Sequence, residues 1–206
     1  MTADTRAPKT RSNYHHGNLR CMLLSTAKTL IAEHGIEYLS LRKLADKVGV
    51  SRTAAYHYFE DKNALLCAIA AEGFGYRQAQ VLKQINASNQ TEREKLHQYI
   101  CDYMHFATTN PEQYELMFGR CIWKQAKCTP ELREIAYATF QHQVEMIGYW
   151  QKVGLMVGDN PLRTAQLLWG TLHGIAKLYI DGIYTDVARV EEIALTAVPM
   201  LVSATD

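Results

Sequence analysis

Two short helices joined by a three-residue turn constrain this chain more than any other feature of its sequence. The first helix is expected to begin after Ser40, a good N-cap residue, and to carry Leu44 and Ala45 on its apolar face. Gly49 can adopt the left-handed backbone conformation that a sharp turn needs, and Ser51 can cap the second helix. This arrangement is typical of a helix-turn-helix, whose second helix enters the major groove of DNA.

The second of these helices divides its side chains between a core-facing and an outward-facing side. Ala55 and Phe59 lie four residues apart, about one helical turn, and are expected to face the core. In the alternative interpretation it is a solvated surface helix, on which Tyr56 and Tyr58 only pack against neighbours. The predicted DNA-binding set consists of residues on and around the outward face: Arg42, Ser51, Arg52, Thr53, Tyr56, His57, Tyr58 and Lys62.

The chemistry of the outward face suits nucleic acid. Arg52 can donate two parallel hydrogen bonds to guanine, and Thr53 and His57 can reach base edges or phosphates. The Tyr56 hydroxyl suits a phosphate, as does Lys62 at the amino-terminal end of the next helix. These residue types at this spacing favour a double-stranded DNA partner.

Charge is unevenly shared along the chain. Residues 1–62 carry ten Lys or Arg and six Asp or Glu, a charge of +4, whereas residues 63–206 carry twelve and fifteen, a charge of −3. A basic amino-terminal third is consistent with binding to a polyanion. Within it, Arg6, Lys9 and Arg11 are placed to follow a phosphate backbone or enter a minor groove, the alternative being a solvated tail.

Helical periodicity dominates the rest of the chain, and no strand-like alternation persists. The polar stretch at 86–91 is expected to separate two domains. We therefore predict an all-α protein of about nine helices. It has a mobile basic arm over 1–17, a three-helix helix-turn-helix domain within 18–86, and a carboxy-terminal helical bundle over 87–206.

Prolines and polar caps mark where helices of the second half begin. Pro111 and Pro130 are each expected in the first turn of a helix, and Asn160 is expected to cap another helix that starts with Pro161. Pro199 is expected to kink the last helix.

Composition favours a cytoplasmic protein without a membrane partner. No apolar run approaches the roughly 18 residues of a membrane span, and the first twenty residues lack the apolar core of a secretory signal. The five cysteines are odd in number and widely spaced, which is typical of reduced thiols.

The segment from about 19 to 68 closely resembles the amino-terminal domain of TetR-family transcriptional regulators. It reads LLSTAKTLIAEHGIEYLSLRKLADKVGVSRTAAYHYFEDKNALL. The resemblance implies an all-helical dimer whose third helix reads a DNA operator and whose carboxy-terminal domain binds a small-molecule effector. The matching residues are Ala27, Glu33, His34, Gly35, Ser40, Leu44, Ala45, Val48, Gly49, Val50, Ser51, Tyr56, Phe59, Lys62 and Leu65.

The chain departs from the family pattern at one position. Many members have Gly-Thr where this chain has Thr53-Ala54, so Ala54 cannot supply the phosphate contact that the family usually takes from that threonine. Thr53 is the candidate substitute. The arm segment NYHHGNLR and the residues Trp169, His173 and Gly174 in LWGTLHG resemble one branch of the family.

Aromatic and methionine side chains are abundant in the second half. Most are expected in the core, and a subset is expected to line an apolar pocket with a few polar groups. The alternative for Trp169 and His173, which lie one turn apart, is a purely structural role. The predicted pocket residues are His105, Phe106, Met117, Phe140, Gln143, Trp169 and His173.

Metal and redox sites are weaker alternatives. His97, Cys101 and His105 share a helix face, but the outer two are about 12 Å apart at about 1.5 Å per residue, too far for one ion on a straight helix. Cys121 and Cys128 flank a polar link, but only two lysines nearby would lower a thiol pKa. Ordinary packing is favoured in both cases, so we predict no metal and no cofactor.

No nucleophile elbow, glycine-rich phosphate loop, HExxH or paired-carboxylate signature occurs, so we predict that the protein is not an enzyme. The sequence favours a ligand-responsive repressor that binds a palindromic operator as a homodimer, with dimerisation through the last two long helices. The alternatives are a helical small-molecule-binding or interaction module with a vestigial helix-turn-helix, and a metal- or redox-sensing regulator.

Overall fold

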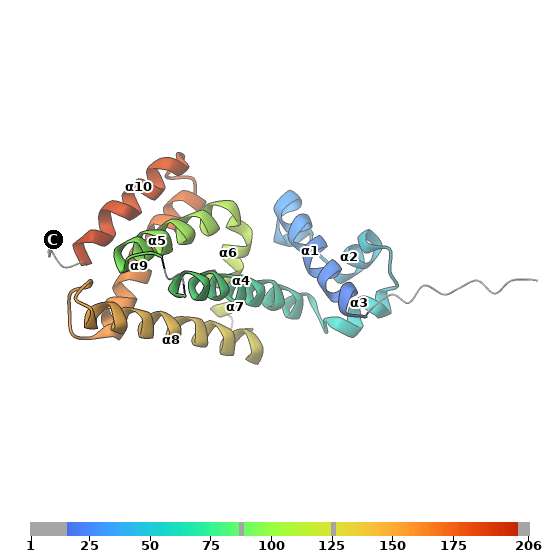
Figure 1. Ribbon diagram of the computed structural model, residues 1–206. Helices are drawn as coiled ribbons and strands as arrows, with labels where there is room; N and C mark the ends of the chain where they lie inside the picture. Colours follow the sequence, from blue (N-terminus) through green and yellow to red (C-terminus); the bar gives the residue numbers. More distant parts are fainter. Residues whose placement is uncertain (1–15, 87–88, 125–126, 202–206) are drawn as a thin grey trace, which may run out of the picture. The chain divides into compact units, whose positions relative to one another are not determined.

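The computed structural model describes residues 16–86, 89–124 and 127–201, and within these ranges all regular structure is helical (Figure 1). Nine helices have seven or more residues, and α7 has four. No described residue lies in a β-strand. The prediction of an all-α fold with about nine helices is therefore confirmed. Arg6, Lys9 and Arg11 of the expected arm lie outside the described residues, and α1 begins at His16.

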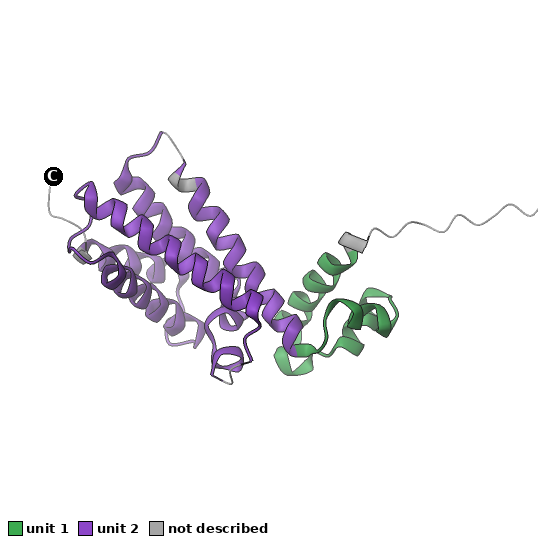
Figure 2. Ribbon diagram, turned by 90° about the horizontal axis from the view of Figure 1, so that it is seen from below, with its two compact units in different colours: residues 1–62 green, residues 63–206 purple. Residues whose placement is uncertain are grey.

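The chain divides into two compact units, residues 1–62 and 63–206 (Figure 2). The first unit contains α1 (His16–His34), the 3₁₀ turn η1 (Ile36–Tyr38), α2 (Leu41–Val48) and α3 (Arg52–Tyr58). Helix α2 packs against both α1 and α3. The core of the unit includes Leu23, Ala27 and Leu44, all completely buried. Leu30 and Ile31 of α1 are also buried, so one face of α1 packs into this core.

Local signals fix the turn between α2 and α3. The Ser40 hydroxyl accepts a hydrogen bond from the Lys43 amide at 3.2 Å at the start of α2. Gly49 ends α2 with a φ of 77°, in the left-handed region where a side chain would be strained. Ser51 then caps α3 in the same way as Ser40 caps α2. Both predicted caps and the predicted glycine turn are confirmed.

The second unit is a bundle of longer helices. Helices α5, α9 and α10 pack on one another, and α9 also packs along α8. Pro111, Pro130 and Pro161 each begin a helix, and the Asn160 side chain caps α9, as predicted. Pro199 lies in η2, directly after α10 ends. The elements are α4 (Lys62–Ile85), α5 (Glu92–Thr109), α6 (Pro111–Phe118), α7 (Arg120–Trp123), α8 (Pro130–Lys152), α9 (Pro161–Ile180), α10 (Val187–Ala197) and η2 (Val198–Leu201).

Helix α4 belongs by its contacts to the second unit, although it begins at the last residue of the first. The Asn63 amide donates to the Lys127 carbonyl at 2.8 Å, and the Gln113 amide donates to the Ile69 carbonyl at 2.8 Å. The compact units therefore divide at residue 62, whereas the sequence prediction placed the domain boundary at residue 86.

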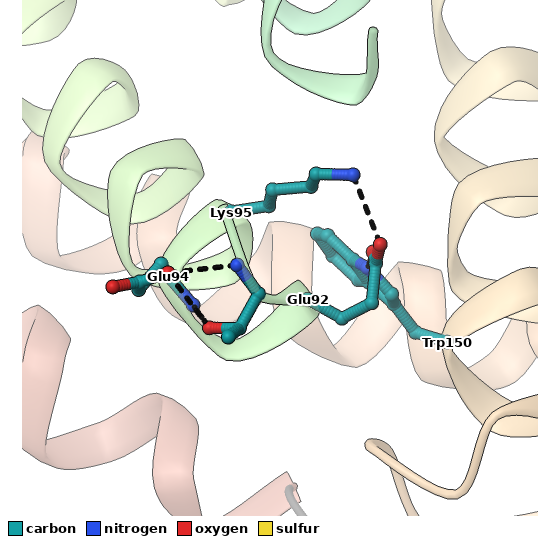
Figure 3. A network of polar contacts seen from close by, with 5 residues as sticks. Glu92, Glu94, Lys95 and Trp150 are labelled. Carbon is teal, nitrogen blue, oxygen red and sulfur yellow. Dashed lines mark hydrogen bonds and ion pairs between the residues drawn. The ribbon is translucent and has the colours of Figure 1, made fainter. Parts of the chain in front are cut away.

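The start of α5 is fixed by polar contacts (Figure 3). Thr91 and Glu94 form a reciprocal capping box. Glu92 accepts hydrogen bonds from Lys95 at 2.9 Å and from the buried Trp150 indole of α8 at 3.0 Å. Burial alone would raise the pKa of Glu92, but these hydrogen bonds outweigh it and lower the pKa. The contact ties the first turn of α5 to the end of α8.

No helix in the described ranges is long and apolar enough to span a membrane.

Candidate functional site

Helix α3 is short and depends on its flanks for stability. Seven residues are too few for an isolated helix in water. The Ala54 amide donates to the Ser51 hydroxyl at 3.1 Å, which satisfies one amide at the start of the helix. Ala55 is completely buried and Phe59 is 4% exposed, and the Arg20 guanidinium lies 5.6 Å from the Phe59 ring centre. The inward side of α3 is therefore anchored as the sequence predicted.

The outward side of α3 presents polar side chains to solvent. Arg52, Thr53 and His57 are exposed, and Tyr56 is 53% exposed. Tyr58 is half-buried, with its ring edge-on to His57 at a centroid distance of 5.4 Å. Two further predicted residues, Arg42 and Ser51, are exposed. Their roles as DNA contacts stay predictions.

Lys62 has an intramolecular role that the sequence did not indicate. Its ammonium group donates to the Ile36 carbonyl at 2.6 Å and is only partly accessible. An ammonium group carries three protons, so this bond leaves donors for a phosphate. Lys62 therefore connects the first residue of α4 to the turn after α1, whether or not it also contacts DNA.

A cavity of about 380 Å³ lies within the second unit, with walls formed by α4 to α9. Five of the seven predicted pocket residues lie in its wall: Met117, Phe140, Gln143, Trp169 and His173. The remaining wall includes five further aromatic side chains: Phe74, Tyr99, Tyr103, Phe118 and Trp123. As ligand contacts these residues stay predictions.

Two predicted pocket residues lie elsewhere. His105 is exposed, whereas Tyr103, two residues earlier on α5, lines the cavity. Because an α-helix turns by about 100° per residue, the two side chains point about 200° apart around the helix axis. Phe106 is 4% exposed, but its ring stacks on Tyr76 at a centroid distance of 5.7 Å rather than lining the cavity. The expectation that these two face the pocket is wrong for this cavity.

The sequence prediction missed the contribution of α4. Phe74, Arg77, Gln78 and Val81 all line the cavity. They share one helix face, but two of the four are polar, and the predicted domain boundary assigned this helix to the other domain.

A buried chain of hydrogen bonds crosses the wall of the cavity. The hydroxyls of Tyr103 and Tyr114 lie 2.7 Å apart, and the Tyr114 hydroxyl lies 2.7 Å from Nδ1 of His173. Burial raises the pKa of both tyrosines, so both are neutral. Burial, together with the nearby Lys177 charge, lowers the pKa of His173. The chain therefore joins three uncharged groups at neutral pH.

The His97 and Cys101 pair forms a local contact. Sγ of Cys101 lies 3.6 Å from Nδ1 of His97. Burial, followed by the carboxylate of Glu191, raises the pKa of Cys101 to about 12, which disfavours a thiolate ligand or nucleophile. Across the part of the chain that the structure describes, no three His, Cys, Asp or Glu side chains converge on a possible metal position.

Comparison with known families assigns both halves of the chain. Residues 23–69 match the family model described as bacterial regulatory proteins, tetR family. Residues 96–200, half of the chain, match the model described as tetracyclin repressor-like, C-terminal domain.

Curated relatives are named as repressors. The chain is 38% identical over 185 residues to the HTH-type transcriptional repressor AcnR of Corynebacterium diphtheriae, a match that covers 86% of this chain and 85% of that protein. It is 32% identical over 117 residues to AcnR of Corynebacterium glutamicum, covering 56% of this chain and 55% of that protein. The chain thus spans about half the length of this second relative and of AcnR from Corynebacterium efficiens.

Solved structures share the fold. A protein with unknown function from Rhodococcus sp. RHA1 superposes with a TM-score of 0.78 at 31% identity, covering 92% of this chain and 96% of that one. A SmeT–triclosan complex superposes with a TM-score of 0.68 at 18% identity, covering 91% and 93%, and supports the fold alone.

Proposed function

This chain belongs to the TetR family of bacterial regulatory proteins and is a DNA-binding transcriptional regulator rather than an enzyme, and we propose that it is a ligand-responsive repressor that binds a palindromic operator as a homodimer. One observation carries this proposal: α3 buries Ala55 and Phe59 while it exposes Arg52, Tyr56 and His57. A helix held this way offers donors to base edges without rearranging its core. The AcnR relatives are named as repressors, which favours repression over activation. A repressor that binds bacterial DNA would act in the cytoplasm.

Dimerisation is supported by apolar side chains on α8 and α9. Tyr137 is 70% exposed, Tyr149 51% and Leu167 60%. Exposed apolar surface of this kind is typical of an interaction site. A two-fold dimer through these helices would present two copies of α3 to successive major grooves, about 34–36 Å apart, and so would match a palindromic operator.

The cavity supports ligand control. Its volume of about 380 Å³ lies within the range of small-molecule pockets, and its wall is mainly apolar with a few polar groups. Helix α4 supplies Phe74 and Arg77 to this wall and is continuous with Lys62, which is bonded to Ile36 in the first unit. A ligand that fits one arrangement of α4 better would shift the population toward it and so change the spacing of the two α3 helices.

The test is DNA selection from random duplexes, followed by fluorescence anisotropy on the enriched sequence. Arg52→Ala and His57→Ala should each weaken specific binding by roughly 5- to 150-fold, the value of one base-reading contact at about 1–3 kcal/mol. Arg189→Ala, which removes an 80% exposed arginine side chain on α10, is the matched control and should leave affinity unchanged.

Unchanged affinity in both α3 variants would show that the assigned face is not the reading face. Failure to enrich any sequence would favour a helical ligand-binding or interaction module with a vestigial helix-turn-helix.

A further inference from the structure

The charge of the cavity wall is one-sided. Its lining contains no aspartate or glutamate, and its one permanently charged side chain is Arg77 of α4. Tyr103 and His173 are neutral for the reasons given above. A ligand in this cavity therefore meets a positive charge and no negative one.

Arg77 occupies the aromatic faces that would otherwise attract a cation. Its guanidinium carbon lies 4.2 Å from the Tyr103 ring centre and 5.8 Å from that of Tyr99. A cationic ligand would have to compete with this built-in cation and would be repelled by it. These two tyrosine faces are therefore not available to a quaternary ammonium group.

The guanidinium group of Arg77 retains unused donors. It donates to the Asp102 main-chain carbonyl over a long 3.4 Å and to the Tyr99 hydroxyl, and it forms no ion pair with any carboxylate in the described part of the chain. Arginine carries five N–H donors in a planar fork that matches a carboxylate. A partly buried guanidinium group without a counter-ion favours an anionic partner.

A second donor belongs to a residue that lines the same cavity, although the donor atom itself is buried within the wall. Nε2 of Gln143 on α8 is buried from solvent and has no hydrogen-bond partner among the described residues. Buried amide groups are almost always paired, so an orphan in a cavity wall indicates an acceptor that the protein does not supply. Arg77 and Gln143 thus both require an acceptor oxygen.

The rest of the wall is rich in aromatic rings, on which an aromatic ligand body can pack face-on or edge-on. Phe118 and Phe140 both lie against Trp169, at centroid distances of 5.8 Å and 6.0 Å. The volume of about 380 Å³ equals that of about 13 water molecules at roughly 30 Å³ each. This is room for two or three fused rings.

We propose that the cavity takes a flat, mainly apolar organic acid whose single carboxylate is held by Arg77 and Gln143. This inference rests on the proposed function, in which the same cavity binds the effector. It excludes organic cations and ranks uncharged molecules of the same shape below the acid.

Three probes that share a naphthalene body test this class by isothermal titration calorimetry on the full chain: naphthalene-2-carboxylate, naphthalene-2-carboxamide and trimethyl(naphthalen-2-yl)ammonium. The carboxylate should bind at least about tenfold tighter than the carboxamide, the range of one charge-assisted hydrogen bond, and the ammonium probe should not bind measurably. Arg77→Met keeps the apolar stem and should abolish the preference while retaining carboxamide binding. Gln143→Leu should weaken carboxylate binding several-fold, and Arg189→Met should change nothing.

Each outcome decides a different point. If all three probes bind equally, or if the ammonium probe binds best, the cavity is a ligand site but the class is wrong. If none binds to the folded wild-type protein, the cavity is not a site for molecules of this shape, and the ligand-responsive part of the proposed function loses its support as well. If Arg77→Met fails to fold by circular dichroism, the order of the three probes on the wild type and on Arg77→Lys still decides the class.

Discussion

The candidate binding side chains face solvent in the first unit and line an internal cavity in the second. In the first, Arg52 and His57 point outward from a helix whose other side is buried. In the second, Arg77 and Gln143 line an internal cavity. Most of the surface around them in this cavity is apolar protein rather than water. Contacts made by the first set are therefore screened by salt, whereas those made by the second are screened much less.

The difference extends to what holds each set in place. The orientation of α3 depends on the Ser51 hydroxyl cap, on burial of Ala55 and Phe59, and on packing against the neighbouring helix α2. The cavity depends on side chains from several helices that are far apart in sequence, such as Tyr103, Tyr114 and His173. The predicted DNA-binding face thus lies within the first unit, whereas the cavity requires side chains from several helices of the second unit.

Substitution of one buried leucine in each unit is expected to give the largest differences in stability and binding between the two units. Leu44→Ala in the first unit and Leu172→Ala in the second each empty a completely buried site, at a cost of about 2–5 kcal/mol of unfolding free energy. Leu44→Ala should lower DNA affinity while carboxylate binding in the cavity is retained, and Leu172→Ala should lower cavity binding first. All three tryptophans (Trp123, Trp150 and Trp169) lie in the second unit, so their fluorescence reports its unfolding alone.

Urea titrations followed by tryptophan fluorescence and by far-UV circular dichroism separate the two cases. Non-coincident transitions in Leu44→Ala would support two units of separate stability. Coincident transitions and equal loss of both binding activities in the two variants would break the comparison, because the chain would then unfold as one cooperative block.

The local structure around α3 could be predicted from the sequence because its main determinants are local. Ser40 and Ser51 are caps, Gly49 is a left-handed turn residue, and each effect acts within four residues of its position. The spacing of Ala55 and Phe59 then fixes which side of α3 faces outward. The partner of Lys62 was missed because Ile36 lies 26 residues away and offers only a main-chain carbonyl, which carries no sequence signal.

The cavity could be predicted only in part because its determinants are not local. Trp169 and His173 were found from their aromatic and polar character, but Arg77 was missed because nothing near it in sequence indicates what α4 packs against. His105 was assigned to the pocket on residue type alone, and the phase of α5 turns it to solvent. Residue type narrows the candidates, and packing between distant helices selects among them.

A Lys62 variant should have a smaller effect. It tests a residue that both stabilises the first unit and is predicted to contact a phosphate. Lys62→Ala should cost about 0.5–1.5 kcal/mol of unfolding free energy through loss of the bond to Ile36. It should also weaken all DNA binding and reduce the salt slope by about one per subunit. Anisotropy at several salt concentrations measures the slope, with the exposed Lys152→Ala as control. Reduced stability with an unchanged slope would leave Lys62 as a purely structural residue.

His173 gives the smallest effect and tests whether the second unit keeps its polar groups neutral. Burial, and then the Lys177 charge, lower the folded-state pKa of His173 below its ordinary value of 6.5, while Glu115 opposes them. Below pH 6.5 the unfolded chain therefore binds the proton more readily than the folded one, so folding stability is lost as the pH falls. Because His173 is only half-buried, the loss should be small.

The measurement is the unfolding free energy of the wild type and of His173→Gln between pH 7.5 and about 5, followed by tryptophan fluorescence. Glutamine keeps a polar group near the Tyr114 hydroxyl but does not titrate, so the pH dependence of the variant should be shallower than that of the wild type below pH 6.5. Equal slopes would mean that the cavity admits a charged histidine at no cost. In that case the cavity wall could carry a positive charge on His173 as well as on Arg77. Selection of an anionic ligand would then depend less on Arg77 alone, so this measurement also bears on the ligand class.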